Sequence, residues 1–296
     1  MKALTRCWSA IVLWLLLMIA IFPHTRAQSA TATLPSQSSD SATSKGDVEY
    51  AQAADALEKN NLEEAIRLFR LSANLGNAHA MNYLGWIYYK GIGVTQDYRQ
   101  AREWYEKAGS AGNVTAIYNL GRMYANGEGV TQDNQKARDL YERCADMGWM
   151  PAMTALGELY RDGKGVPQDY QKAREWFEKA ASKGHGGGLN DLADLYAMGH
   201  GVPQDYQKAK QLLEQAAAAG NANAMNNIGF LYEHGTGVPQ DLEQARQWYE
   251  KAVAAGSACA MTNLGRMYQS GQGVKPDQKQ AQQLFDKAKA LGTCGM

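Results

Sequence analysis

The sequence predicts an all-α protein in which seven helix-turn-helix repeats stack into a solenoid. A glycine recurs every 36 residues, each followed two positions later by a second glycine and then by valine; this series is Gly91, Gly127, Gly163, Gly199, Gly235 and Gly271. A second glycine series has the same period and runs from Gly76 to Gly292. Within each period, apolar residues follow i, i+3, i+4, i+7 spacing on two separate segments, which indicates two amphipathic helices per repeat.

The first 46 residues are expected to precede the fold. Residues 1–27 combine a basic start, an apolar run over 10–22 and Thr25-Arg26-Ala27, the pattern of a cleaved secretory signal peptide. The apolar run is shorter than the roughly 20 residues that span a bilayer, and an uncleaved membrane anchor is the alternative. Residues 28–46 are rich in Ser, Thr and Ala, which predicts a disordered tether.

Charge argues against a nucleic-acid partner. The chain has 296 residues with 30 basic and 30 acidic side chains. Loss of residues 1–27 removes three basic residues and no acidic ones, which leaves 27 basic and 30 acidic residues and a net charge of −3. No basic tract remains that could follow a phosphate backbone.

The helix boundaries are predicted by capping residues. In the repeat that begins at Ala80, the first helix runs from about 80 to 90 and stops at Gly91, which can adopt a left-handed conformation. The second helix begins after Asp97, with Gln100 three residues later as in a capping box. Equivalent aspartates recur at Asp133, Asp169, Asp205, Asp241 and Asp277. The N-terminal unit, residues 47–79, lacks the glycine-rich turn and has Asn61 as its N-cap.

Small residues predict close packing between the two helices of a repeat. Glycine recurs in the first helix at Gly85, Gly121, Gly157, Gly229 and Gly265, with Ala193 as the one substitute. Alanine recurs in the second helix from Ala101 to Ala281. We expect the tyrosines that recur from Tyr88 to Tyr268 to fill the space beside these small residues. A single hairpin has too little core to fold alone, so stability must come from stacking. The last repeat has a polar second helix and is expected to be a terminal cap.

The motif Met81-x₂-Leu84-Gly85-x₂-Tyr88 followed by Ala101-x₃-Tyr105 resembles the tetratricopeptide pattern. The 36-residue period and the G-x-G-V turn resemble its Sel-1-like repeat subfamily more closely. Six Sel-1-like repeats are assigned to residues 80–296, and the unit at 47–79 resembles a plain tetratricopeptide repeat. The resemblance implies a right-handed α/α superhelix whose first helices line a concave groove.

One side of the first helices is predicted to face that groove. Core positions such as 81, 84, 85 and 88 fix the buried side, so positions such as 82, 86 and 89 lie opposite. This side varies between repeats and is rich in Asn, Arg and aromatic residues, the types that recognise a protein or peptide partner. The predicted groove residues are Asn82, Trp86, Tyr89, Tyr118, Arg122, Glu158, Arg161, Asn190, Asp194, Asn226, Phe230 and Arg266.

Three cysteines remain after signal cleavage, which is an odd number in a compartment that permits disulfides. Cys259 precedes the first helix of the last repeat and Cys294 follows its second helix. An antiparallel helix pair would bring these two ends together, so a Cys259–Cys294 bridge is predicted. Cys144 replaces a core alanine and is predicted to be a buried thiol.

Two local departures lead to weaker hypotheses. Trp149-Met150-Pro151 replaces polar residues between repeats, so these side chains form either a second contact point or local packing. The run from Gly184 to Gly188 leads into a helix, where glycine is unfavourable, and predicts a flexible joint.

No catalytic motif is present: the sequence has no HExxH, GxSxG or P-loop. The histidines form no close pair, and no cofactor or metal is expected. The sequence therefore favours an exported, non-catalytic scaffold that binds a protein or peptide, as a periplasmic adaptor or regulator. The alternatives are a secreted factor that binds host proteins and, less favoured, a hydrolase of cell-wall or β-lactam substrates.

Overall fold

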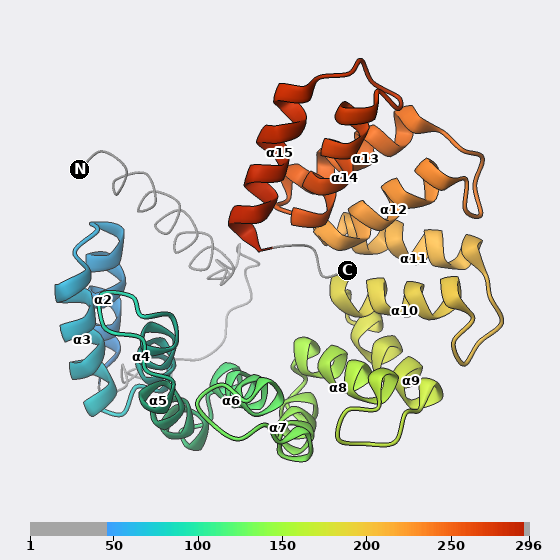
Figure 1. Ribbon diagram of the computed structural model, residues 1–296. Coiled ribbons are helices and arrows are strands. Elements are labelled where there is room, and N and C mark those ends of the chain that lie inside the picture. The colour runs from blue at the N-terminus through green and yellow to red at the C-terminus, as the bar shows by residue number, and fades with distance from the viewer. Residues whose placement is uncertain (1–45, 293–296) are drawn as a thin grey trace, which may run out of the picture. The chain divides into compact units, whose positions relative to one another are not determined.

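The computed structural model describes residues 46–292, and every regular element in this range is a helix (Figure 1). The predicted signal peptide, nearly all of the predicted tether, and Cys294 lie outside the described residues. The helices are α2 (Asp47–Glu58), α3 (Leu62–Asn74), α4 (Ala78–Lys90), α5 (Tyr98–Ser110), α6 (Val114–Asn126), α7 (Asn134–Asp146), α8 (Met150–Asp162), α9 (Tyr170–Ser182), α10 (Gly186–Met198), α11 (Tyr206–Ala218), α12 (Ala222–His234), α13 (Leu242–Ala254), α14 (Ala258–Ser270) and α15 (Gln278–Leu291). In chain order they make up the seven predicted pairs of helices, and we name the two helices of each repeat helix A and helix B.

The chain divides into two compact units. The first contains 46–123 and 127–131, and the second contains 124–126 and 132–292. In the second unit each helix A packs on its own helix B and on the helix B before it. Helices A of neighbouring repeats also contact each other, α8 with α10, α10 with α12 and α12 with α14, whereas the described helices B of this unit make no extended contact with one another. A stack with one set of helices drawn together is curved, so the helix-A side is the inner side of this unit.

The caps lie where the sequence predicts them. Asp97 Oδ1 accepts a hydrogen bond of 3.0 Å from the backbone N–H of Gln100 at the start of α5. In each later repeat the equivalent aspartate accepts the same bond. Asn61 caps α3 in the same way through the N–H of Glu64. These bonds satisfy backbone donors that a helix leaves unpaired at its N-terminus.

The two glycines of each G-x-G-V turn have different functions. Gly199 ends α10 with φ +71°, a left-handed conformation that favours glycine. Gly201 receives the preceding repeat: a Cβ added there would lie 2.8 Å from Cβ of Tyr170, the first residue of α9. Gly93 meets Leu62 of the first repeat in the same way. The turn of the first repeat, Asn60-Asn61, has no glycine at this position.

The close approach of helix A and helix B depends on an aromatic residue of helix B, and this corrects the role expected of the Tyr88 series. A Cβ added to Gly157 would lie 2.3 Å from Cε1 of Phe177, and the same contact joins Gly85 to Tyr105 at 2.5 Å. The Tyr88 ring is only half-buried and its hydroxyl accepts a hydrogen bond from Arg70. Tyr160, Tyr196 and Tyr232 of this series are likewise only partly buried and pack against the core cluster of the second unit.

The one exception to the glycine series is matched by its partner. Ala193 of α10 stands where other repeats have glycine, and Leu213 of α11 stands where Phe177 does in the repeat before. Both Ala193 and Leu213 are buried in the same core cluster. The added Cβ of alanine is thus accommodated by a branched aliphatic side chain in place of a flat ring.

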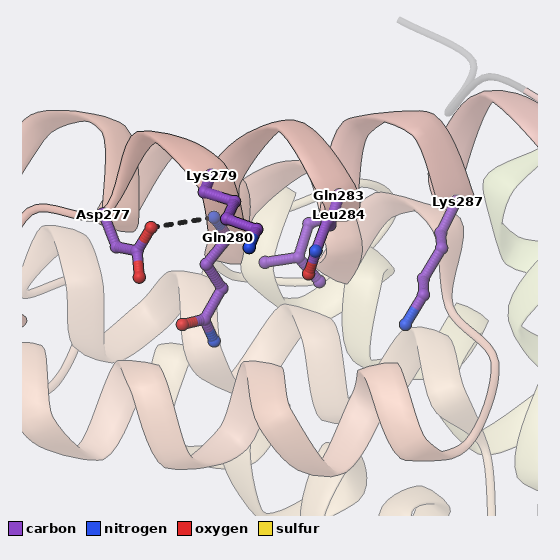
Figure 2. A pocket seen from close by; sticks show the side chains of 6 residues that line it. All are labelled: Asp277, Lys279, Gln280, Gln283, Leu284 and Lys287. Carbon is purple, nitrogen blue, oxygen red and sulfur yellow. Dashed lines mark hydrogen bonds between the residues drawn. The ribbon is translucent and has the colours of Figure 1, made fainter.

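The last helix ends the array with a polar surface. Figure 2 shows a shallow pocket on α15 in which Lys279, Gln280, Gln283 and Lys287 surround Leu284. Leu284 itself is buried. Gln278 occupies the position from which Tyr170 presses on the next repeat. Polar side chains around the last apolar residues are consistent with the predicted terminal cap.

The glycine-rich run from Gly184 to Gly188 leads into a regular helix, α10, and its last three residues belong to that helix. Gly186 and Gly187 form its first turn, and the His185 ring caps it by accepting a hydrogen bond of 3.2 Å from the N–H of Gly188. A Cβ on Gly188 would lie 2.5 Å from Cβ of Ala180, so this glycine allows α10 to pack closely on α9. The glycines therefore have a packing function, and the flexible joint stays a prediction for amide exchange to test.

Candidate interaction surface

In the second unit, the helix-A face, which is the side of the helices A opposite their buried core positions, carries two rows of side chains with different properties. We define the inner row as the asparagines and acids at the Asn82 and Tyr83 positions of the repeat, and the outer row as the residues at the Trp86 position. The 36-residue period aligns each row across neighbouring helices A. Residues four positions apart lie on one side of a helix, so both rows belong to the same face.

The inner row holds neighbouring repeats together. Asn227 Nδ2 donates to Asn190 Oδ1 at 3.1 Å, and Asn263 Nδ2 donates to Asn226 Oδ1 at 3.0 Å. In the first unit, Asn119 Nδ2 donates to Asn82 Oδ1 at 3.3 Å. Asn82, Asn190 and Asn226 were predicted to face a partner. In the structure, their side-chain oxygens accept hydrogen bonds from asparagines of the next repeat.

The outer row contains the predicted residues that reach solvent. In the second unit it consists of Glu158, Asp194, Phe230 and Arg266. Glu158 and Arg266 are exposed, Asp194 is half-buried, and Phe230 is 47% exposed with its ring stacked on His234 at 4.0 Å between ring centroids. An exposed phenylalanine between charged residues is typical of a recognition surface.

Carboxylates gather at the α8–α10 end of this face. Burial, followed by the charge of Asp191, raises the pKa of Asp194 to about 7. Although the Glu158 side chain reaches solvent, partial desolvation of its carboxyl group, followed by the charge of Asp191, raises the pKa of Glu158. Two cations lie nearby: Lys164 pairs with Asp162 at 2.9 Å, and Arg161 has its Nε 2.7 Å from Asp162 Oδ1 and its Nη1 4.0 Å from Asp191 Oδ1. Both cations are thus already paired with Asp162, and the pKa values of Glu158 and Asp194 stay raised.

The predicted residues of the first unit are more strongly tied to the fold. The Tyr89 hydroxyl donates to Glu128 Oε2 at 2.9 Å, which joins α4 to the turn of the next repeat. Trp86 is half-buried and meets Tyr83 edge to face, at 6.2 Å between ring centroids. Tyr118 is half-buried and Arg122 is exposed. In this unit Arg122 is therefore the predicted residue that most clearly reaches solvent.

Sequence reasoning missed the partners of the inner row. Asn119, Asp191, Asn227 and Asn263 lie one residue beyond the predicted positions, where the helical argument placed no groove residue. The signal that could have identified these pairs is two polar residues 37 positions apart, as in Asn82 with Asn119. Each bond joins a residue of one repeat to the residue one position after its equivalent in the next repeat. The 36-residue comparison overlooks such pairs.

Trp149 packs locally and is not an exposed contact point. The indole is half-buried at the N-cap position of α8, and its Nε1–H lies buried without a hydrogen-bond acceptor. Met150 is also half-buried. Unlike the other helices A from α4 onward, α8 has no side-chain cap, because Trp149 replaces the Asn, His or Ser found there.

The cysteines differ in environment. Cys144 is fully buried, and burial raises the pKa of its thiol to about 12. Cys259 takes part in a disulfide. Its predicted partner, Cys294, lies outside the described residues, so the pairing stays a prediction.

Two further findings bear on the kind of site. Among the described residues, no group of three or more His, Cys, Asp or Glu side chains is placed to hold a metal ion. Within the same range, no helix is both long and apolar enough to cross a bilayer. The feature that remains is a helical face with a row of varied side chains, which defines the class of repeat proteins with an interaction surface.

The chain belongs to the Sel1 repeat family. The model of the Sel1 repeat matches seven stretches, residues 49–77, 78–113, 114–149, 151–185, 188–221, 222–257 and 260–293. The first stretch falls on the unit that we expected to be a plain tetratricopeptide repeat, so this unit is counted as a Sel1 repeat without the glycine-rich turn. A comparison with curated proteins gives no match.

Solved structures support the assignment. A Sel1 repeat protein from Oxalobacter formigenes is 33% identical over 81% of this chain and 99% of that chain, with a TM-score of 0.70. A protective antigen of uropathogenic Escherichia coli is 28% identical, with a TM-score of 0.56 over 83% of this chain and 61% of that chain. An immunity protein of Pseudomonas aeruginosa is 21% identical over 73% of this chain and 82% of that chain, with a TM-score of 0.52, and shows the shared fold alone.

Proposed function

We propose that this protein is an exported, non-catalytic scaffold that binds a protein or an extended peptide on the helix-A face of its repeats, as a periplasmic adaptor or regulator. The outer row carries the proposal. Its position in the repeat is the same in every helix A from α4 to α14, yet its residues are Trp86, Arg122, Glu158, Asp194, Phe230 and Arg266. A position whose only function was to keep the surface polar would not need aromatic, acidic and basic side chains in turn.

The contrast with the core supports this interpretation. At the helix-B core position, alanine recurs at Ala101, Ala137, Ala173, Ala209 and Ala245, each fully buried. The repeats are therefore uniform at this core position of helix B and diverse at the outer-row position of helix A. Membership of the Sel1 repeat family, whose proteins generally mediate protein–protein interactions, agrees with a binding function.

Capture of a partner with matched variants tests the proposal. The exported chain, and variants Asp194→Lys and Phe230→Ser, would be used to capture proteins from an envelope extract. We expect the wild type to retain a protein that the two variants lose. As a control, Glu175→Lys makes a comparable charge change on the exposed surface of α9 and should not affect retention. Equal retention by all four proteins would exclude the helix-A face as the binding surface.

A secreted factor that binds host proteins is the second candidate. The observation that favours it is the resemblance to the Escherichia coli protein described as a protective antigen. Cell fractionation separates the candidates, because an adaptor is expected in the periplasm and a secreted factor in the culture supernatant. Recovery of the chain in the cytoplasm with its first 27 residues intact would exclude both.

A further inference from the structure

The outer row of the second unit forms an ordered line of charges around an aromatic ring. Glu158 lies on α8, Asp194 on α10, Phe230 on α12 and Arg266 on α14. The helices that carry them contact in this order. Packed helices lie about 8 to 10 Å apart, so each step along the row has about that length. The row therefore runs from two acids, over an exposed apolar ring, to one base.

The charged members of the row are available for a partner. Glu158, Asp194 and Arg266 take part in none of the ion pairs or side-chain hydrogen bonds among the described residues. Arg161, by contrast, is paired with Asp162 and lies 4.0 Å from Asp191. Two carboxyl groups, exposed in Glu158 and half-buried in Asp194, thus lie at one end of the row without an ion-pair partner. The exposed guanidinium of Arg266 lies at the other end, beyond the ring of Phe230.

The acids do not match a metal ion. Glu158, Asp191 and Asp194 are spread over two helices and are not grouped so that three of them could hold one cation, as found for all the described residues. A basic side chain needs no such cage, because a single carboxylate can pair with an ammonium or guanidinium group. A peptide can also place an apolar side chain against the exposed Phe230 ring, next to its own basic residue. A metal ion has no apolar surface to do so.

On the premise of the proposed function, we propose that this row selects an extended segment of a protein partner with basic residues at one end, a large apolar side chain in the middle and an acidic residue at the other end. An extended chain rises about 3.3 Å per residue, so one step of the row corresponds to about three residues. The segment thus has two basic residues, an apolar residue and an acidic residue, each about three positions after the last.

Peptides of defined pattern test this specificity. A fluorescent peptide with Arg, Arg, Leu and Glu at every third position, separated by Gly and Ser, would be titrated with the whole chain and followed by anisotropy. A peptide of the same composition in scrambled order is the control. We expect at least 10-fold tighter binding of the ordered peptide, and a smaller difference at high salt because the contacts are ionic. Equal affinity for the two peptides would overturn the proposal.

Charge reversal makes the test specific for the row. Arg266→Glu should weaken the ordered peptide about 10-fold and recover it when the acidic residue of the peptide is changed to Lys. Glu175→Lys on α9 should leave both affinities unchanged, and denaturation midpoints would verify that each variant is folded. Absence of recovery would refute the assigned order. If envelope capture depends on Asp194 and Phe230 while ordered and scrambled peptides bind equally, the scaffold function stands and the specificity is wrong.

Discussion

Substitution of Gly157 by alanine tests how the repeats are held together. An added Cβ would lie 2.3 Å from Cε1 and 2.5 Å from Cδ1 of Phe177, well inside the van der Waals distance. The ring has 0% exposure and cannot move into solvent. Overpacking of this kind costs about 1 to 3 kcal/mol, while the helix propensity of alanine returns up to about 1 kcal/mol. We expect Gly157→Ala to lower the free energy of unfolding by about 1 to 2 kcal/mol.

The fifth repeat supplies the compensating change. It pairs Ala193 with Leu213 where the fourth repeat pairs Gly157 with Phe177. Phe177→Leu alone should cost about 1 to 2 kcal/mol, which is part of the 3 to 5 kcal/mol typical of Phe→Ala. Contacting residues couple by about 0.5 to 3 kcal/mol. The double variant should therefore be about as stable as Phe177→Leu alone, and clearly more stable than the sum of the two single changes.

Urea unfolding followed by far-UV circular dichroism measures these differences. Repeat proteins can unfold in more than one step, so transition slopes must be compared before midpoints are converted to free energies. As a reciprocal control, Leu213→Phe opposite Ala193 should destabilise. A Gly157→Ala variant as stable as the wild type would refute the close-packing argument, and strict additivity in the double variant would refute the compensation.

Three further predictions follow from single residues. The pKa of Asp194 is raised to about 7, mainly by burial and then by Asp191, against the opposing charge of Arg161. Between about pH 4 and 7 the folded state therefore holds a proton that the unfolded state has lost, and the free energy of unfolding falls as pH rises through this range. Asp194→Asn should thus gain stability over the wild type at pH 8 relative to pH 5, and an equal difference at both pH values would count against it. Gly201→Ala should destabilise more than Gly184→Ala: both have positive φ, but only the first meets a neighbour, Tyr170, at 2.8 Å, and equal denaturation midpoints would contradict this. Cys144 should resist alkylation in the native chain and react after unfolding, because its thiol is fully buried and its pKa is raised to about 12; rapid native labelling seen by mass spectrometry would disagree.

The capping residues made the helix boundaries predictable, because Asp97 and its equivalents act through local backbone bonds that a sequence displays directly. The close approach of helix A and helix B was also predictable from Gly157 and its equivalents, since only a small residue suits such a contact. Its partner was not. Tyr88 and Tyr105 are both aromatic and both recur, and which ring enters the gap depends on the angle between the helices, which the periodicity does not contain.

The candidate surface was predicted less completely for a similar reason. The helical periodicity separated the buried side of helix A from the side on which Glu158, Phe230 and Arg266 reach solvent. It could not separate side chains that face a partner from those that face the adjacent helix A. Asn190 and Asn226 bond to the next repeat because the A helices touch, and that proximity follows from the curvature of the stack rather than from any one repeat.

The receiving glycine gives the array a direction and makes its length adjustable. Each internal repeat carries both the residue that contacts the next repeat and the glycine that receives the preceding one, so a block of 36 residues contains both halves of the junction. Duplication or loss of such a block joins surfaces that already match elsewhere in the chain. The turn of the first repeat, Asn60-Asn61, differs because it lacks this glycine. Gain or loss of internal repeats can therefore change the length of the helix-A face without a new kind of junction.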